Sequence, residues 1–182
     1  MTKINEACEK VLYSEEIIEA KCKEIAQKIS EDYAGEEVTL VSILNGSFMF
    51  TSDLIKKLTV DCRIDFLQVS TYGASTVSSG KFTVKKPLSL DIENKNVLIV
   101  EDIIDTGFTM VNLLKYIEGF NPKSIKLCTL IDKPHRRTQD ISADYACFTM
   151  ENDEFIVGYG LDYAQNYRNL PYIAVLKEQI YN

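Results

Sequence analysis

The stretch VLIVEDIIDTGFTM, residues 97–110, joins an apolar run to a loop that carries both acidic and small residues. Its first four residues have the composition of a fully buried, parallel strand. Three carboxylates follow within five positions, at Glu101, Asp102 and Asp105, and we expect the next helix to begin near Thr109. A buried strand, a loop and a helix in this order indicate an α/β fold with a mainly parallel sheet.

The carboxyl end of this strand is predicted to bind an anion together with a group that carries hydroxyls. Ligands of open parallel sheets collect at this edge, where the free N–H groups of the next helix are partly positive. Gly107 lets the backbone come close, and Thr106 and Thr109 can donate from their hydroxyls. Glu101 and Asp102 then need another partner at the edge, because unpaired burial of a carboxylate is costly. A ribose 5-phosphate with a hydrated Mg²⁺ satisfies both requirements.

Helix-like and strand-like segments alternate along the rest of the chain, which extends the α/β pattern to all of it. Ser14 can cap a first helix with an apolar face, and the polar segment 73–80 is expected to be a mobile loop. With no internal repeat or linker, residues 1–182 are predicted to form a single domain. The other expected strands lie at 38–44, 61–72, 81–88, 124–131 and 143–150, with two short ones after 150, and the other expected helices lie at about 47–58 and 109–120.

Composition narrows the classes of protein that the chain can represent. Its 182 residues are 46% hydrophobic, enough for one domain with a real core, and its net charge of −7 disfavours general nucleic-acid binding. The absence of a long apolar run and of a signal-peptide core predicts a soluble, cytoplasmic protein with no membrane contact. The five cysteines form no C-x-x-C pair, so we expect free thiols. The single histidine, His135, excludes a multi-histidine zinc site.

Other nucleotide-binding and hydrolytic motifs are missing. The chain has no G-x-x-x-x-G-K-[ST], and its segment Ser79–Phe82 fails that pattern. The pair of glycines in Gly158–Gly160 lacks the third glycine and the helix start of a dinucleotide fingerprint. No G-x-S-x-G elbow occurs either.

Taken with four further blocks, the stretch 97–110 resembles the phosphoribosyl-diphosphate (PRPP) motif of type I phosphoribosyltransferases, in the form found in their hypoxanthine and hypoxanthine-guanine branch. LNGSFMF (44–50) stands where that family has its diphosphate loop, and TYGASTVSSG (71–80) where it has its flexible catalytic loop. LIDKPHRR (130–137) and EFIVGYGLDYAQNYRNLPYI (154–173) match its purine-binding and C-terminal segments. The resemblance covers nearly the whole chain. It implies a central, mainly parallel sheet flanked by helices, with a small hood formed by the terminal segments.

The resemblance implies an Mg²⁺-dependent enzyme of purine salvage that joins a 6-oxopurine to PRPP, releasing diphosphate and giving IMP or GMP. Glu101 and Asp102 would hold the ribose hydroxyls and the metal, and Asp162 a second metal near the purine. Asp105 would face N7 of the purine as general acid/base, where a carboxylate within hydrogen-bond reach eases proton transfer. The implied phosphate- and diphosphate-binding residues are Asn45, Gly46, Asp105, Thr106, Gly107, Phe108, Thr109 and Arg168.

For the purine itself, the resemblance implies that Lys133 donates to the 6-oxo group, Phe155 stacks on the ring and Ile156 presents backbone groups. Thr71 and Tyr72 would lead the catalytic loop that closes over the reaction. Without the family, Lys133 would belong to a solvated charge run and Phe155 to the core. The neighbours His135, Arg136 and Arg137 are assigned to the surface.

The chain departs from the family at three positions. Thr71 replaces a serine and keeps its hydroxyl, Asn45 stands where many relatives have lysine, and Glu154 replaces a lysine found in some. The choice among hypoxanthine, guanine and xanthine stays open. So does the oligomer, since relatives form homodimers and homotetramers, for which the helix at 48–58 is a plausible interface.

Two other interpretations remain on the same fold. The first is a non-catalytic regulator that binds RNA and senses nucleotides, which should show a basic face with interspersed aromatics. The chain instead has 20 basic against 27 acidic residues, and its catalytic positions are filled. The second, adenine or orotate specificity, conflicts with Lys133 and with the block EFIVGYGLDY.

Overall fold

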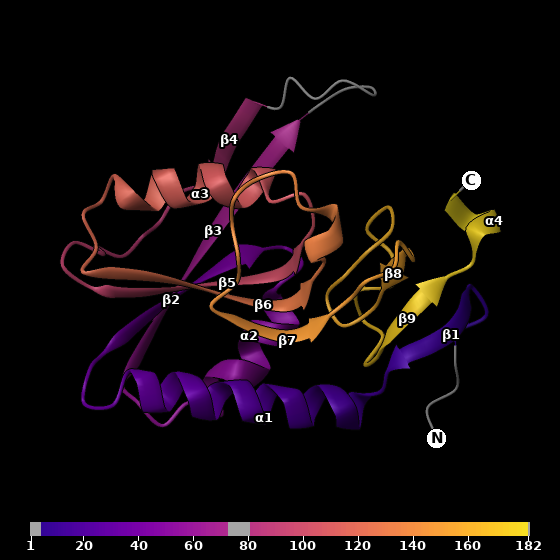
Figure 1. The fold of residues 1–182 in the computed structure, drawn as a ribbon, viewed down its shortest axis with the longest axis horizontal. Coiled ribbons are helices and arrows are strands. Elements are labelled where there is room, and N and C mark those ends of the chain that lie inside the picture. The colour runs from indigo at the N-terminus through magenta and orange to yellow at the C-terminus, as the bar shows by residue number, and fades with distance from the viewer. Residues whose placement is uncertain (1–4, 73–80, 182) are drawn as a thin grey trace.

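The structure is a computed structural model that describes residues 5–72 and 81–181. In this part of the chain, six strands form the larger of two sheets (Figure 1). Neighbouring strands are parallel except for one antiparallel pair at the edge. In spatial order they are β4 (Lys81–Lys86), β3 (Cys62–Tyr72), β2 (Val38–Leu44), β5 (Asn96–Ile104), β6 (Ser124–Asp132) and β7 (Tyr145–Thr149).

A smaller antiparallel sheet of three strands lies beside the large one and joins the two ends of the chain, at the right in Figure 1. Its first strand follows the N-terminus and its other two come from the last thirty residues. The predicted fold class, a mainly parallel sheet with a hood of terminal segments, is thereby confirmed. The hood consists of β1 (Cys8–Tyr13), β9 (Ile173–Leu176) and β8 (Ile156–Val157), followed by the short helix α4 (Glu178–Tyr181).

Helices cover both faces of the large sheet (Figure 1). The helices α1 (Glu15–Asp32) and α2 (Phe48–Ile55) lie on one face, and α3 (Phe108–Glu118) lies on the other. A single turn of 3-10 helix, Pro134–Arg136, follows β6. Within the described part of the chain, no helix combines the length and the apolarity needed to cross a membrane.

The central strands are apolar on both sides because each side meets a helical layer. In β5, Leu98 and Val100 belong to the same core cluster as α1 and α2, whereas Val97 and Ile99 belong to the cluster under α3. Successive side chains of a strand point to opposite faces, so this alternation follows from the strand geometry itself. A continuous apolar run such as 97–100 is therefore what a strand buried on both faces requires.

The first helix begins as the sequence predicts. The hydroxyl of Ser14 accepts a hydrogen bond from the backbone N–H of Ile17 at 3.4 Å, and the first turn carries Glu15 and Glu16 at the positive end of the helix dipole. Its buried face includes Ile18, Cys22, Ile25 and Ile29. The expected apolar stripe is confirmed.

The strand β5 is longer than the sequence predicts. Its pairing with β6 continues past Val100, with Glu101 opposite Thr129 and Ile104 opposite Asp132. Glu101 and Asp102 therefore lie in the last part of a strand, and Glu101 is buried although the sequence placed both beyond the core. The hydrogen-bonded ladder extends a strand regardless of the charge of its side chains.

Three smaller differences concern the ends of elements. The helix α2 ends at Ile55, before the expected end near Leu58, and the structure adds β1 and α4, which show little pattern in the sequence. The segment 73–80, predicted to be a loop, lies outside the described residues.

Replacing Leu98 by alanine should test the packing of the central strand. Leu98 is fully buried between β5 and the layer of α1 and α2, so we expect the free energy of unfolding to fall by about 2–5 kcal/mol. Urea denaturation followed by circular dichroism would measure it. Ile17→Ala on the exposed side of α1 is the control, with an expected change within about 0.5 kcal/mol. Equal losses in the two variants would contradict this packing.

Candidate active site

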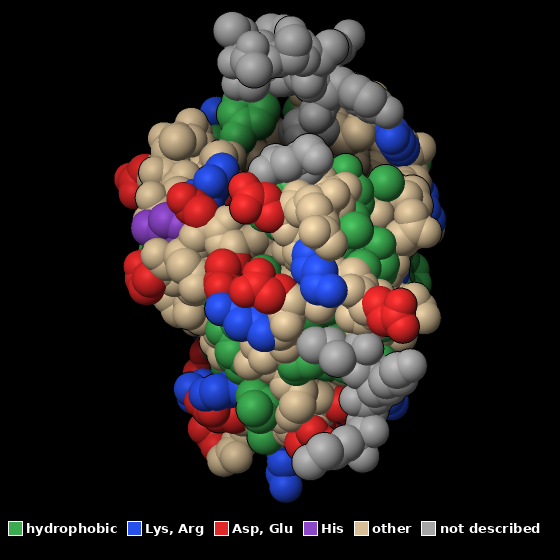
Figure 2. Space-filling view, turned by 90° about the vertical axis from the view of Figure 1, so that its right-hand side faces the viewer, with side chains coloured by type: hydrophobic (Ala, Val, Ile, Leu, Met, Phe, Trp, Pro, Cys, Tyr) green, Lys and Arg blue, Asp and Glu red, His purple; other side chains and the backbone are tan. Residues whose placement is uncertain are grey.

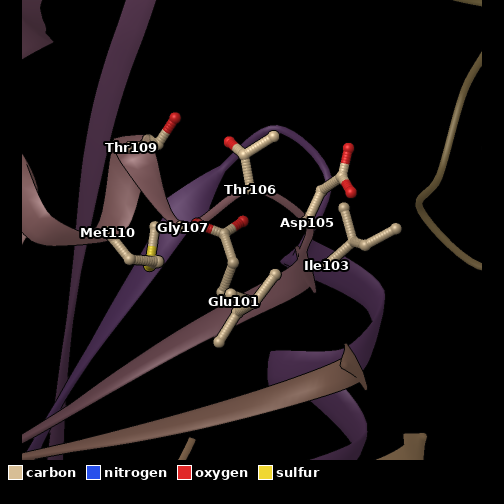
Figure 3. A pocket seen from close by; sticks show the side chains of 8 residues that line it. Glu101, Ile103, Asp105, Thr106, Gly107, Thr109 and Met110 are labelled. Atoms are coloured by element: carbon tan, nitrogen blue, oxygen red, sulfur yellow. The ribbon is translucent and has the colours of Figure 1, made fainter. Parts of the chain in front are cut away.

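A cavity of about 300 Å³ opens at the carboxyl end of β5, where the strand turns into α3 (Figure 3). Figure 3 shows Thr106 extending from the loop and Thr109 from the first turn of α3, while the carboxylate of Asp105 points away from them. Free N–H groups at the start of α3 add a partial positive charge. The cavity is lined by Glu101, Ile103, Ile104, Asp105, Thr106, Gly107, Thr109 and Met110.

The loop before α3 is held by a left-handed glycine, Gly107, and by Arg137, which follows the 3-10 turn after β6. Gly107 has φ +85°, and a Cβ there would lie 2.6 Å from Ile141 Cγ2. Arg137, nearly buried, donates from Nη1 to the backbone carbonyl of Asp105 at 2.5 Å and forms an ion pair with Asp132. Arg137, which the sequence analysis assigned to the surface, therefore holds the loop before α3 in place.

Glu101 and Asp102 form a close carboxylate pair. The backbone N–H of Asp102 donates to Glu101 Oε1 at 3.1 Å. Burial, together with the neighbouring negative charge of Asp102, raises the pKa of Glu101 well above its usual range. No group of three or more carboxylate, cysteine or histidine ligands occurs in the described residues. The pair is an acidic, oxygen-rich position that a cation or several hydroxyl donors would satisfy.

Gly46 brings a second loop against this pair. A Cβ at Gly46 would overlap the carboxylate of Asp102, and a Cβ at Gly160 would overlap the carbonyl oxygen of Gly46. The loop also contains a cis peptide bond between Leu44 and Asn45. Three segments that are far apart in the sequence thus meet with their backbones in contact, which only glycine permits at both positions.

Three buried hydroxyls stabilise the loop that contains Gly46. Ser42 Oγ lies 2.9 Å from Ser47 Oγ and 2.8 Å from Thr51 Oγ1, and Ser47 donates to the carbonyl of Ile43 at 2.7 Å. Each of the three hydroxyls has a partner, so the turn from β2 into α2 is satisfied without solvent.

A second cavity, of about 350 Å³, adjoins the first and shares Asp105 and Ile103 with it. Lys133 lines it with only 6% of its surface exposed, and its ammonium donates to the carbonyl oxygen of Glu154 at 3.0 Å. Burial lowers the pKa of Lys133, and the negative charge of Asp105 partly opposes that shift. The residues lining the second cavity are Asp102, Ile103, Asp105, Lys133, Arg136, Asp153, Glu154, Phe155, Ile156, Leu161 and Asp162.

Phe155 presents an aromatic ring to this second cavity. Its ring is stacked on Tyr181 with 4.9 Å between centroids and meets Tyr163 edge-on at 5.7 Å. Phe155 is nevertheless 37% exposed and lines the cavity, which neither tyrosine does. Ile156, the next residue, is buried in β8 and pairs with Val175 of β9. The ring of Phe155 is therefore held by the two tyrosines, which lie outside the cavity, and remains accessible from the cavity itself.

Asp162 and Arg168, predicted as separate ligands, are paired with each other. Arg168 Nη2 lies 2.8 Å from Asp162 Oδ1, and the other oxygen of Asp162 accepts from the backbone N–H of Gln165 at 2.8 Å. Arg168 also donates to the carbonyl of Gly160 at 2.6 Å. A ligand of Asp162 or Arg168 would therefore have to share the side chain with these partners or replace one of them.

Asp105 has a partner that the sequence did not predict. Arg136 Nε donates to Asp105 Oδ1 at 2.6 Å, and both side chains are 42% exposed. Arg136 and Arg137 were both assigned to the surface because charge runs usually are solvated, so only their spacing after Lys133 could have suggested a role.

The structure brings nearly all of the predicted site residues to two adjoining cavities. Glu101, Asp105 and the loop 106–109 surround the first, with Phe108 as the first residue of α3. Asp102, Lys133, Phe155, Ile156 and Asp162 line the second. Gly46 lies against Asp102, and Arg168 pairs with Asp162. Asn45 precedes Gly46 in the same loop, and its side chain accepts a hydrogen bond from Gln68, not from a residue of either cavity. Thr71 and Tyr72 end β3, and their side chains lie outside the description.

Comparison with known proteins decides which family has this arrangement. Residues 10–164 match the family described as "Phosphoribosyl transferase domain". The chain belongs to the phosphoribosyltransferase family. Among curated relatives, the hypoxanthine-guanine phosphoribosyltransferase of Streptococcus agalactiae serotype V is 49% identical over 95% of this chain and 96% of its own length. That of Streptococcus thermophilus is 47% identical with the same coverage.

Solved structures of phosphoribosyltransferases have the same fold. The crystal structure of a hypoxanthine phosphoribosyltransferase from Staphylococcus aureus matches with a TM-score of 0.93 and 45% identity, covering 97% of this chain and 95% of that one. A hypoxanthine-guanine phosphoribosyltransferase from Bacillus anthracis matches with a TM-score of 0.90 and 45% identity, covering 93% of this chain and 99% of that one. The recognised resemblance is therefore confirmed for the family and for its fold.

Glu101→Gln should stabilise this phosphoribosyltransferase chain at alkaline pH. The pKa of Glu101 is raised in the folded state, so that state binds its proton more tightly than the unfolded chain does, and stability falls as the pH rises between the two pKa values. Removing the charge should raise the free energy of unfolding at pH 8 by about 1 kcal/mol or more. Near pH 4, where the carboxyl is protonated in both states, the gain should vanish.

Urea denaturation at the two pH values would measure this difference. Glu118→Gln, at an exposed position on α3, is the control and should change little at either pH. A loss of stability for Glu101→Gln at pH 8 would show that the carboxylate pair is satisfied within the protein.

Proposed function

We propose that the chain transfers the phosphoribosyl group of PRPP to N9 of hypoxanthine, and also of guanine, giving IMP or GMP and diphosphate. The observation that carries this proposal is the position of Asp105, which lines both cavities. One cavity has the features of a phosphate site and the other those of a site for a flat, polar ring. A group shared by the two stands where the bond between sugar and base would form.

The first cavity would bind the ribose 5-phosphate. The backbone amides at the start of α3 and the hydroxyls of Thr106 and Thr109 would donate to the phosphate oxygens. Glu101 and Asp102 would accept hydrogen bonds from the ribose hydroxyls, which replaces the repulsion of two bare carboxylates by favourable contacts. The phosphate of this ligand needs hydrogen-bond donors and its ribose needs acceptors, which explains why acidic side chains lie beside an anion site.

The donor set fits Mg²⁺. Two adjacent carboxylates offer hard oxygen ligands, and Mg²⁺ is commonly bound by one or two carboxylates together with water and substrate oxygens. Glu101 and Asp102 would hold the ion at the ribose, and Asp162 a second ion, sharing its oxygens with Arg168 and the Gln165 amide. When bound, Mg²⁺ would neutralise charge on the diphosphate.

The second cavity would select a 6-oxopurine. Lys133 now donates to a carbonyl and would donate to O6 of the base. The 6-amino group of adenine would leave this ammonium facing another donor in a buried place, which is a strong penalty. Phe155 would stack on the purine, and the backbone of Ile156 would meet its edge.

Proton transfer would fall to Asp105. As N9 attacks the anomeric carbon, the purine must lose a proton, and a carboxylate near N7 would accept it. Charge separates between an oxocarbenium-like ribose and the leaving diphosphate. Arg168, with the backbone amides of Asn45 and Gly46, would bind that diphosphate, since a guanidinium fork matches phosphate oxygens. The loop led by Thr71 and Tyr72 would exclude water from the cation.

Three broader properties belong to the same proposal. The enzyme would act in purine salvage in the cytoplasm. Residues 1–182 would work as one domain, consistent with a core cluster that joins α1 and β5 to the hood residues Ile156 and Ile173. It would assemble as a homodimer or homotetramer, with Phe48, 43% exposed on α2, available for a contact between subunits.

The alternative of an RNA-binding regulator finds no support in the comparisons. Such a protein would need a continuous basic face. On the face shown in Figure 2, acidic and basic side chains are interspersed.

The first test is product formation from PRPP with hypoxanthine, guanine, xanthine and adenine in parallel, with Mg²⁺ and with an excess of chelator. We expect hypoxanthine to be converted and adenine to be rejected, with turnover lost on chelation and restored by added Mg²⁺. The guanine and xanthine reactions would determine the preference at C2. Folded protein that binds a nucleotide but converts none of the four bases would overturn the proposal.

Lys133→Met should test the selection of the 6-oxo group. The variant keeps the length of the side chain and loses the donor, so kcat/KM for hypoxanthine should fall about 10- to 100-fold, the value of one hydrogen bond to a charged group. The ratio of hypoxanthine to adenine turnover should fall with it. Lys95→Met, at an exposed position just before β5, is the matched control. An unchanged ratio would show that Lys133 does not contact the base.

A further inference from the structure

The guanidinium of Arg136 bridges two carboxylates at the second cavity. Its Nε donates to Asp105 Oδ1 at 2.6 Å, and its Nη1 donates to Asp153 Oδ1 at 3.2 Å. All three side chains line the cavity. One cation is thus shared between the carboxylate proposed to accept the purine proton and a second carboxylate with no part in that reaction.

Asp153 is itself shared. The imidazole Nε2 of His135 lies 2.8 Å from the same Oδ1 that Arg136 contacts, and His135 Nδ1 lies 3.1 Å from the carbonyl of Met150. Hydrogen bonds from His135 and then from Arg136 lower the pKa of Asp153. Asp153 therefore offers Arg136 an alternative anionic partner to Asp105.

The contact of Arg136 with Asp105 conflicts with the proposed chemistry. Asp105 Oδ1 already accepts a hydrogen bond from the guanidinium, so it has less free acceptor capacity for the N–H at purine N7. The pair is half-exposed, and ion pairs of this kind contribute little to stability. Arg136 can therefore leave Asp105 at small cost, provided that another anion receives it.

We propose that Arg136 is a positioning residue that divides between Asp105 and Asp153, and that it moves fully to Asp153 when the purine binds. Asp105 is then released toward N7 only in the presence of a base. Between turnovers Arg136 holds the carboxylate in place at the boundary of the two cavities. This inference rests on the proposed function, since it assumes that Asp105 accepts the purine proton.

The other charged groups around Asp105 are unchanged when Arg136 or Asp153 is substituted. Lys133 faces it across the cavity, and Arg137 holds its backbone carbonyl. Asp102 lines the same cavity. On the side of Asp153, His135 and Glu154 complete the charged neighbours, and Glu154 pairs with Lys10 of β1. Among the described residues, Arg136 donates hydrogen bonds to both carboxylates.

Two substitutions should move the reaction in opposite directions. Arg136→Gln removes the cation, so the acid limb of the pH profile of kcat/KM for hypoxanthine, at saturating PRPP, should move to higher pH. Asp153→Asn leaves Arg136 with Asp105 as its anionic partner, so the limb should move to lower pH. For half-exposed pairs we expect shifts of about half a pH unit.

Arg63→Gln is the matched control, because Arg63 forms an exposed ion pair with Glu37 at the start of β3, the end of the strand opposite to the site. Thermal unfolding would establish that each variant is folded at every pH used. If the acid limbs of the two pH profiles coincide with that of the control, or move in the same direction, Arg136 is not shared between Asp105 and Asp153 and the proposal is overturned. Failure of the unmodified enzyme to convert hypoxanthine would instead overturn the proposed function, so the two failures are distinguishable.

Discussion

Two adjacent carboxylates at the end of the central strand are the constraint on which the rest of the site depends. Glu101 is buried and Asp102 meets the backbone of Gly46, so neither can turn away into solvent as a surface acid would. Burial and then the negative charge of Asp102 raise the pKa of Glu101 in the folded state. A chain keeps such a cost where the site needs a binding partner to relieve it.

Local sequence was enough to predict the centre of the site but not its supports. The strand, the acidic pair and the loop around Gly107 are contiguous, so their placement followed from periodicity and from the geometry of parallel sheets. Arg136 and Arg137 act on Asp105 from more than thirty residues away, and in the sequence they belong to an ordinary charge run. Charge runs carry no mark that separates a solvated arginine from one that folds back onto a loop.

The same reasoning explains the other differences. The strand β5 extends through its acidic residues because β6 continues beside it, which is a tertiary effect. The contact of Gly160 with Gly46 requires two glycines more than a hundred positions apart, and each taken alone reads as a turn. Tyr181 supports Phe155 from a four-residue helix at the end of the chain, too short to leave a periodic signal. Family resemblance supplied the roles of Lys133, Phe155 and Arg168, whereas the physical pattern alone favoured surface or core.

The proposed substrate is a polyanion although the net charge of the chain is −7, and the pairing of the cations in the site can explain this combination. Lys133 donates to a carbonyl, and each of the three arginines already has an acidic partner: Asp105 and Asp153 for Arg136, Asp132 for Arg137, and Asp162 for Arg168. Diphosphate binding at Arg168 would therefore replace one anion, Asp162, by another and would require little new desolvation of an unpaired charge. Because these ion pairs are partly exposed, breaking one costs little free energy. Which anion the arginine binds then depends on the geometry of the site more than on the net charge of the chain. Specific recognition of an anion then needs no basic surface.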